Sequence, residues 1–198
     1  MRLLLTAAIA VTLGLLWWTS EQPSAAMPGA RAPLAPIQLA SDRDDPIERD
    51  GFVLQPLARF EATAKVLGRE DYWMDKESEL SPTDLALGWG RMSDPQVIEQ
   101  LDIDQRGRWY HYRWVGSQPP IPLGEIVRSS ANMHFIPADE SAAAALDAVR
   151  EGQVVRFSGY LVEVRKLDGW RWRSSLTRED SGGGACEIVL LERLEVSY

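Results

Sequence analysis

The chain has 198 residues, of which 45% are hydrophobic and 25% charged, as is usual for a globular protein. Its formal net charge of −8 argues against binding nucleic acid and against an electrostatic attachment to anionic lipids. Its single cysteine, Cys186, excludes an intramolecular disulfide, a cysteine-based zinc site and a lipoprotein attachment near the N-terminus.

The N-terminal segment predicts export. An apolar run over residues 3–18 follows Arg2, and one cation before such a run predicts membrane insertion with the N-terminus in the cytoplasm. Residues 1–20 therefore form either a signal peptide, cleaved near Ala26, or a retained anchor slightly shorter than the ~20 residues that a span needs. The two tryptophans that end the run favour the anchor, because indole rings suit the membrane interface.

Residues 21–50 are expected to form a tether. Four prolines interleaved with alanine and glycine are followed by a charged patch over residues 42–50. Proline at this density interrupts helices and sheets, and the charges resist burial. Residues 51–198 then make up a single β-rich domain outside the cytoplasm, long enough to bury one core.

Two strands are predicted in the first half of this domain. Alternating apolar and polar residues over 57–67 predict a half-buried strand. A second alternation over 108–115 is rich in aromatic residues and also favours a strand. The inner face of the first strand is expected to consist of Phe60, Ala62, Ala64 and Val66.

Short helices are expected between these strands. A serine–proline pair at residues 81–82 predicts a helix start, and a glycine at 88 or 90 its end. Ser93 with Gln96 forms a capping box for a second short helix. Residues 125–136 predict another strand or a pair of short ones.

The last third begins with a clear helix. Asp139 caps an alanine-rich segment of about twelve residues that ends at Gly152. Residues 154–166 predict a strand in which Gly159 marks a bulge or bend. Asp168-Gly169 is typical of a two-residue type I′ hairpin turn, and residues 187–196 predict the closing strand.

These elements predict an α+β domain that is mainly β. A helix between the third and fourth strands of a small, partly open barrel is typical of an OB-like arrangement. An SH3-like barrel or an irregular α+β sheet remains the alternative. No internal repeat is present.

Motifs for metals and nucleotides are absent from the sequence. The two histidines, His111 and His134, do not have the spacing of metal ligands, and no phosphate loop or dinucleotide fingerprint occurs. No metal and no cofactor is therefore expected.

The candidate catalytic residues are Cys186, His134 and Asp180. Cys186 follows a glycine run, where backbone N–H groups can stabilise an oxyanion, and His134 can act as its base. Asp180 or Asn132 would orient the imidazole ring. The simpler interpretation is that Cys186 is a small apolar residue at the start of a buried strand.

The candidate binding residues are Trp170, Trp172, Arg178 and Trp89. Trp170 and Trp172 share one face of a strand, where exposed indoles would stack on sugars or on a partner's side chains. Arg178 belongs to a polar segment over residues 174–181, and Trp89 lies between two glycines. The alternatives are that the tryptophans are core residues and that the polar segment is a turn.

Three segments carry a resemblance. DLALGWG (84–90), SANMHFIPA (130–138) and SSLTRED with GACE (174–187) resemble segments of uncharacterised bacterial proteins that are exported or membrane-anchored. The resemblance implies a single domain on the periplasmic side of a bacterial inner membrane, or release into the periplasm after cleavage. It implies no activity.

The leading functional hypothesis is a non-catalytic, membrane-tethered binding or assembly module whose partner is a protein or an envelope polymer. Its basis is the tether together with an aromatic β domain. A cell-envelope cysteine hydrolase or transferase that uses Cys186 and His134 is the second hypothesis. A module that binds carbohydrate or peptidoglycan is the third.

Overall fold

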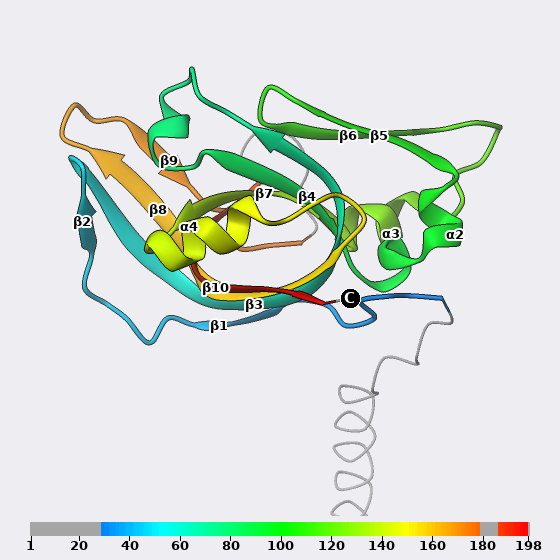
Figure 1. Ribbon diagram of the computed structural model, residues 1–198, viewed down its shortest axis with the longest axis horizontal. Helices are drawn as coiled ribbons and strands as arrows, with labels where there is room; N and C mark the ends of the chain where they lie inside the picture. The colour runs from blue at the N-terminus through cyan, green and yellow to red at the C-terminus, as the bar shows by residue number, and fades with distance from the viewer. Residues whose placement is uncertain (1–28, 179–185, 198) are drawn as a thin grey trace, which may run out of the picture.

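The computed structural model describes residues 29–178 and 186–197 (Figure 1). Over this part of the chain the protein is mainly β, with a twisted, partly closed sheet and few helices. The predicted membrane segment at residues 1–18 lies outside the described residues. Among the described residues, no helix is long and apolar enough to cross a membrane.

The long strand β3 (Phe52–Asp71) is the spine of the sheet. Along one edge its residues 52–65 pair with the whole of β8 (Val154–Lys166). Its other edge is shared, in order, by β2 (Ile47–Arg49), β1 (Ile37–Ala40) and β4 (Thr83–Gly88). This length lets β3 pair with four other strands.

The remaining pairings lead from β4 back to β8, so that the strand order closes on β3. β4 pairs with β7 (Ser130–Pro137), and β7 pairs in parallel with β10 (Glu187–Ser197). β10 pairs antiparallel with β8, which already pairs with β3. The short strand β9 (Arg171–Arg173) continues along β8 beyond the end of β10.

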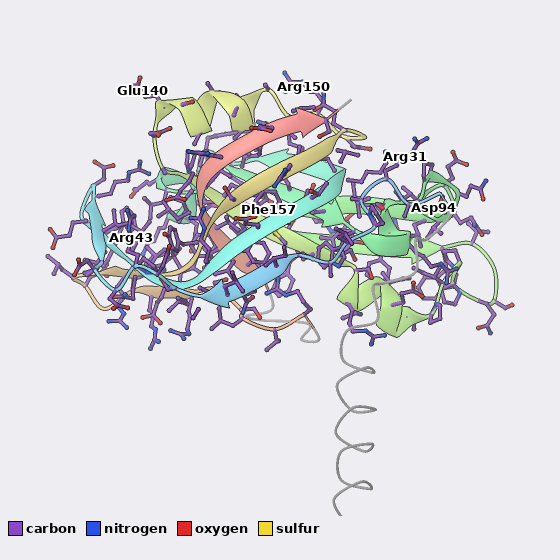
Figure 2. All side chains as sticks on the ribbon, turned by 90° about the horizontal axis from the view of Figure 1, so that it is seen from below. Arg31, Arg43, Asp94, Glu140, Arg150 and Phe157 are labelled. Atoms are coloured by element: carbon purple, nitrogen blue, oxygen red, sulfur yellow. The ribbon has the colours of Figure 1, made fainter. Side chains whose placement is uncertain are left out.

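Helix α4 (Glu140–Asp147) connects β7 to β8 and packs on β10 and β7. Figure 2 shows it along one side of the sheet, between Glu140 and Arg150. Its apolar side, with Ala142 and Leu146, joins the main core cluster. Asp139 caps the helix by accepting a hydrogen bond from the Ala142 N–H (2.8 Å).

A second, two-stranded sheet stands beside the first. It consists of β5 (Leu101–Arg106) and β6 (Trp109–Trp114), and β5 packs against β3. The described residues also form four short helical segments, which are η1 (Glu77–Glu79), η2 (Gly90–Ser93), α2 (Pro95–Ile98) and α3 (Leu123–Arg128). Of these, η2, α2 and α3 contribute to a core cluster that includes residues of β5 and β6.

Several sequence predictions are confirmed. Within β3, the four residues expected on the inner face are all buried in the main core cluster, and the intervening residues are only partly buried. β8 has the predicted bounds, and α4 begins at the predicted cap, although it ends at Asp147 and has eight residues instead of about twelve. The short helix predicted after Ser93 is α2, although its cap is Asp94, which accepts from the Gln96 N–H.

The structure differs from the predicted tether at residues 29–50. Residues 37–40 and 47–49 form β1 and β2, which pair with β3. Ala32 is buried, and its N–H donates to Ser93 Oγ (2.9 Å). The open edge of β3 supplies hydrogen-bond partners that a proline and charge count does not reveal.

The helix predicted from residue 82 to residue 88 or 90 is wrong, because residues 83–88 form β4. Every residue of β4 is buried, so this strand has no polar face to give an alternating pattern. Residues 125–136 divide between α3 and β7 instead of forming strands alone.

The hairpin predicted at residues 168–169 exists, but its turn is not type I′. Gly169 is left-handed (φ +90°), whereas Asp168 has no positive φ, and the Lys166 N–H donates to Trp170 O across a three-residue loop. Pairs of left-handed residues occur instead at Asp50-Gly51 and Gly107-Arg108.

Candidate functional site

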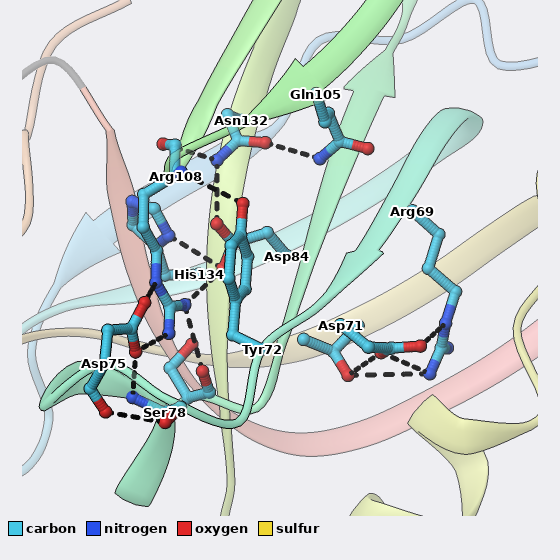
Figure 3. Close-up of polar contacts among 12 residues, drawn as sticks. Arg69, Asp71, Tyr72, Asp75, Ser78, Asp84, Gln105, Arg108, Asn132 and His134 are labelled. Carbon is cyan, nitrogen blue, oxygen red and sulfur yellow. Dashed lines mark hydrogen bonds and ion pairs between the residues drawn. The ribbon is translucent and has the colours of Figure 1, made fainter.

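A completely buried carboxylate, Asp84, is the centre of the candidate site (Figure 3). Arg108 Nη1 donates to Asp84 Oδ1 (2.9 Å), and Asn132 Nδ2 donates to Asp84 Oδ2 (3.2 Å). His134 Nδ1 lies 2.9 Å from Asp84 Oδ1, at ion-pair distance, although the ring N–H is not aligned for a hydrogen bond. Such partners are necessary because burying an unpaired carboxylate is costly.

The register of β4 and β7 creates this arrangement. Asp84 pairs directly with His134, so their side chains lie on the same face of the sheet. Asn132, two residues before His134 on β7, lies on that face as well. Gln105 of β5 donates to Asn132 Oδ1 (2.7 Å) and so links the network to the second sheet.

Arg108 reaches the network from the turn between β5 and β6. It is a non-glycine residue in the left-handed region (φ +69°), a conformation with a steric cost that its surroundings must offset. Its backbone N–H donates to the Tyr72 hydroxyl (2.9 Å), and its guanidinium stacks 3.9 Å from the centre of the Tyr72 ring. The guanidinium also donates to Asp75 and to Ser81 O.

Two carboxylates flank a single guanidinium group in this network. Arg108 lies between the carboxylates of Asp75 (2.7 Å) and Asp84 (2.9 Å). Its hydrogen bond holds the pKa of Asp75 below the ordinary value. Burial opposes the charge of Arg108, but the two carboxylates outweigh it and raise the pKa of Arg108. The guanidinium is therefore a permanent cation that joins three segments.

A pocket of about 290 Å³ opens above the network. The ring of His134 contacts that of Trp172 on β9, with centroids 4.8 Å apart. The pocket thus combines aromatic walls with charged groups held by buried partners, a common composition of ligand sites. It is lined by Glu77, Arg108, Trp109, His134, Trp172, Arg173 and Cys186.

Two of the three predicted catalytic residues meet in this pocket. Cys186 and His134 both line it, although they are 52 positions apart in the sequence. Asp180 lies outside the described residues. Asp84 lies beside the imidazole, and Asn132, one of the two residues expected to orient that ring, contacts Asp84.

The predicted binding residues separate into different environments. Trp172 lines the pocket, and Trp170 contacts the ring of Phe52 edge-on at 6.2 Å. The planes of the two indoles meet at 54°, so they do not form one flat platform. Arg178 pairs with Glu187 and stacks over Phe60.

Trp89 is a core residue. It is buried in the main hydrophobic cluster, and its backbone N–H donates to Ser129 O (2.9 Å). The glycine that follows it, Gly90, is left-handed (φ +53°) and lets the chain turn tightly into η2.

Sequence reasoning missed Arg108, Asp75 and Tyr72. The available signal was Gly107-Arg108 between two alternating runs, which indicates a hairpin turn. That pattern does not reveal the contacts of the arginine side chain. Among the described residues, no group of three or more His, Cys, Asp or Glu side chains is arranged to hold a metal ion.

Comparison of the chain with protein-family models, with curated proteins and with solved structures gives no match.

Proposed function

We propose that the described domain is an OB-like binding module of the cell envelope, without catalytic activity, whose ligand site is the pocket above Asp84. The order of pairing β3-β4-β7-β10-β8, the parallel β7–β10 pair and the helix between β7 and β8 support the OB-like assignment over an SH3-like one.

The position of the pocket carries this proposal. OB-folds bind ligands on the face of their second and third strands, between the loop after strand one and the loop after strand four. The corresponding elements here are β4, β7, residues 72–82 and, of the connection from β8 to β10, the described residues 167–178 and Cys186. All of them contribute to the pocket or to its buried support: Asp75, Glu77, Asp84, His134, Trp172 and Cys186.

Location in the envelope is part of the same proposal. The apolar run at residues 3–18 supports an anchor in a bacterial inner membrane with the domain in the periplasm. Release into the periplasm after cleavage near Ala26 is the alternative. Because β1 already begins at Ile37, the connection between membrane and domain is shorter than the sequence suggests.

Site-specific photocrosslinking in intact cells tests the proposal. A photoreactive phenylalanine derivative replaces Trp109, which lines the pocket, and in a matched protein it replaces the fully exposed Val115, which does not. We expect an adduct only from position 109, and its mass will distinguish a protein from a polymer partner. Equal labelling at both positions, or none at position 109, would contradict a ligand site here.

A second candidate function is supported by one observation, the shared pocket of Cys186 and His134 with Asp84 beside the imidazole. In a cysteine hydrolase or transferase, His134 would accept the thiol proton and the sulfur would attack an acyl carbon. The leaving group would depart with that proton. Water or a second acceptor would then cleave the thioester.

Alkylation kinetics distinguish the two functions. A nucleophilic cysteine reacts with iodoacetamide near pH 7 faster in the folded protein than in urea, where the thiol has its ordinary reactivity. A binding module with a structural cysteine gives the opposite order. Because one protein supplies both rates, no variant is needed.

A further inference from the structure

Three arginines converge on one buried carboxylate on the β8–β9 hairpin. Glu163 has a completely buried side chain, and it accepts hydrogen bonds from Arg165, Arg171 and Arg173 (2.6 Å for Arg173). The register explains this convergence, because Glu163 pairs with Arg173 and Arg165 pairs with Arg171. These four side chains therefore share one face of the hairpin, while Val164 and Trp172 share the other.

The cluster has an excess of positive charge. Three guanidinium groups and one carboxylate leave a local net charge of +2, in a chain whose formal net charge is −8. The next residues across the sheet, Val53 and Gln55 of β3, are uncharged and add no carboxylate. Like charges brought together at a surface repel, so a second anion would stabilise this cluster.

Most donors of the cluster remain available. A guanidinium group has five N–H donors, and in the described part of the chain each of these side chains makes its one hydrogen bond to Glu163. The side chains of Arg165, Arg171 and Arg173 are 56%, 56% and 47% exposed. Glu163 thus holds three forks of donors in place before any ligand arrives, which reduces the entropic cost of binding.

We infer that this tri-arginine cluster is a binding site for a soluble anion with closely spaced phosphate groups. The arginine fork matches the geometry of phosphate oxygens, and at least two negative charges are needed to balance the cluster. A soluble anion is favoured over a membrane surface because the acidic domain as a whole is repelled by anionic lipid.

Inorganic triphosphate is the first probe, with the full-length protein and calorimetry at low salt. Arg171→Gln and Arg165→Gln remove one arginine each, and neither residue lines the pocket above Asp84, whereas the third arginine, Arg173, does. Arg156→Gln is the matched control, since it removes the same charge from an exposed position on β8. We expect about tenfold weaker binding for each cluster variant and little change for the control.

Arg171→Lys separates geometry from charge. A fork-shaped contact predicts a loss of about threefold or more, whereas a purely diffuse attraction predicts none. Equal binding by the wild type and by both cluster variants, with unfolding curves showing that all are folded, would overturn the site. So would an equal loss in Arg156→Gln.

A second experiment, with lipid vesicles, tests whether the phosphate groups belong to lipid headgroups instead of a soluble anion. The wild type and Arg171→Gln are compared on phosphatidylglycerol and phosphatidylcholine vesicles, because the shared N-terminal segment contributes equally to both proteins. No difference between them is expected. A loss confined to phosphatidylglycerol, without a loss of triphosphate binding, would overturn the assignment to a soluble anion. Failure of the photocrosslinking at Trp109 leaves this inference unaffected.

Discussion

Asp84 illustrates how a single residue couples stability to the candidate site. Its carboxylate is buried with contacts to Asn132 and His134 of β7 and to Arg108 from the turn between β5 and β6. Removing one partner of a buried ion pair leaves the others without compensation for their lost hydration. The network therefore fixes the positions of Arg108 and His134, which line the pocket. The lost hydration of its buried charged groups is compensated only while all of the partners are present.

Asp84→Asn is expected to lower the free energy of unfolding by about 3 kcal/mol, because it removes the charge and places an amide N–H₂ beside other donors. Urea denaturation measures this loss. The matched control is Asp102→Asn, whose ion pair with Arg113 is exposed (62% and 69%) and is expected to contribute less than about 1 kcal/mol. Similar losses in the two variants would contradict the role of burial.

The carboxylate of Glu163 predicts how the stability of the protein changes at acidic pH. Burial opposes its charge, but hydrogen bonds from Arg173, Arg171 and Arg165 outweigh burial and lower its pKa from 4.5 to about 2. A lowered pKa in the folded state stabilises the protein above the unfolded value, and this contribution disappears as the pH falls through the folded value.

The stability difference between the wild type and Glu163→Gln is therefore expected to shrink as the pH falls from 4.5 toward 2. Urea midpoints measured at intervals across this range show the change. If the two proteins keep a constant difference down to pH 2, the carboxylate does not have the lowered pKa.

At the scale of elements, glycine positions decide how closely strands approach. The register of β10 against β8 shifts between Leu191 and Arg193, opposite Gly159. A Cβ on Gly159 would lie 1.9 Å from the Leu190 carbonyl oxygen, a backbone atom that cannot move aside cheaply. The bulge that this glycine permits also places Glu192 against Arg59 (2.5 Å).

Gly159→Ala is expected to destabilise the protein by about 2 kcal/mol through overpacking of the β8–β10 contact. The control is Gly124→Ala in α3, where the new Cβ would meet only the flexible end of Arg128 at 3.2 Å. Alanine favours a helix, so this control is expected to gain up to about 1 kcal/mol. Thermal unfolding of both variants measures these changes in stability. Equal changes in Gly159→Ala and Gly124→Ala would contradict the steric argument.

At the scale of the whole molecule, residues 29–50 complete the sheet. They supply β1 and β2 along the open edge of β3, and Asp42 accepts a hydrogen bond from the Tyr160 hydroxyl (2.7 Å). Figure 2 shows the start of this segment at Arg31 beside Asp94, far from Arg43. Without it, the edge of β3 would expose unpaired backbone groups.

A chain that lacks residues 1–50 is therefore expected to melt at a lower temperature and to self-associate through the exposed edge of β3. Light scattering and thermal unfolding measure these two effects. The control lacks only residues 1–28, so both proteins lack the apolar N-terminal run. If the two shortened proteins behave alike, residues 29–50 do not stabilise the domain.

The sequence by itself determined the elements whose signals are local. Alternation marked the inner face of β3, the aspartate cap marked α4, and continuous β propensity marked β8 and β10. Each of these signals arises from a few neighbouring residues, so it can be recognised without knowing the fold.

Only the tertiary structure decided the rest. β4 is buried on both faces and therefore shows no periodicity, and β1 and β2 exist because β3 offers them a free edge. Cys186 and His134 were each noticed in the sequence, but their meeting depends on the pairing of β7 with β10. The contacts of Arg108 with Asp84 and Asp75 were not predicted. The long-range partners of a side chain are set by strand register and packing, which no local pattern encodes.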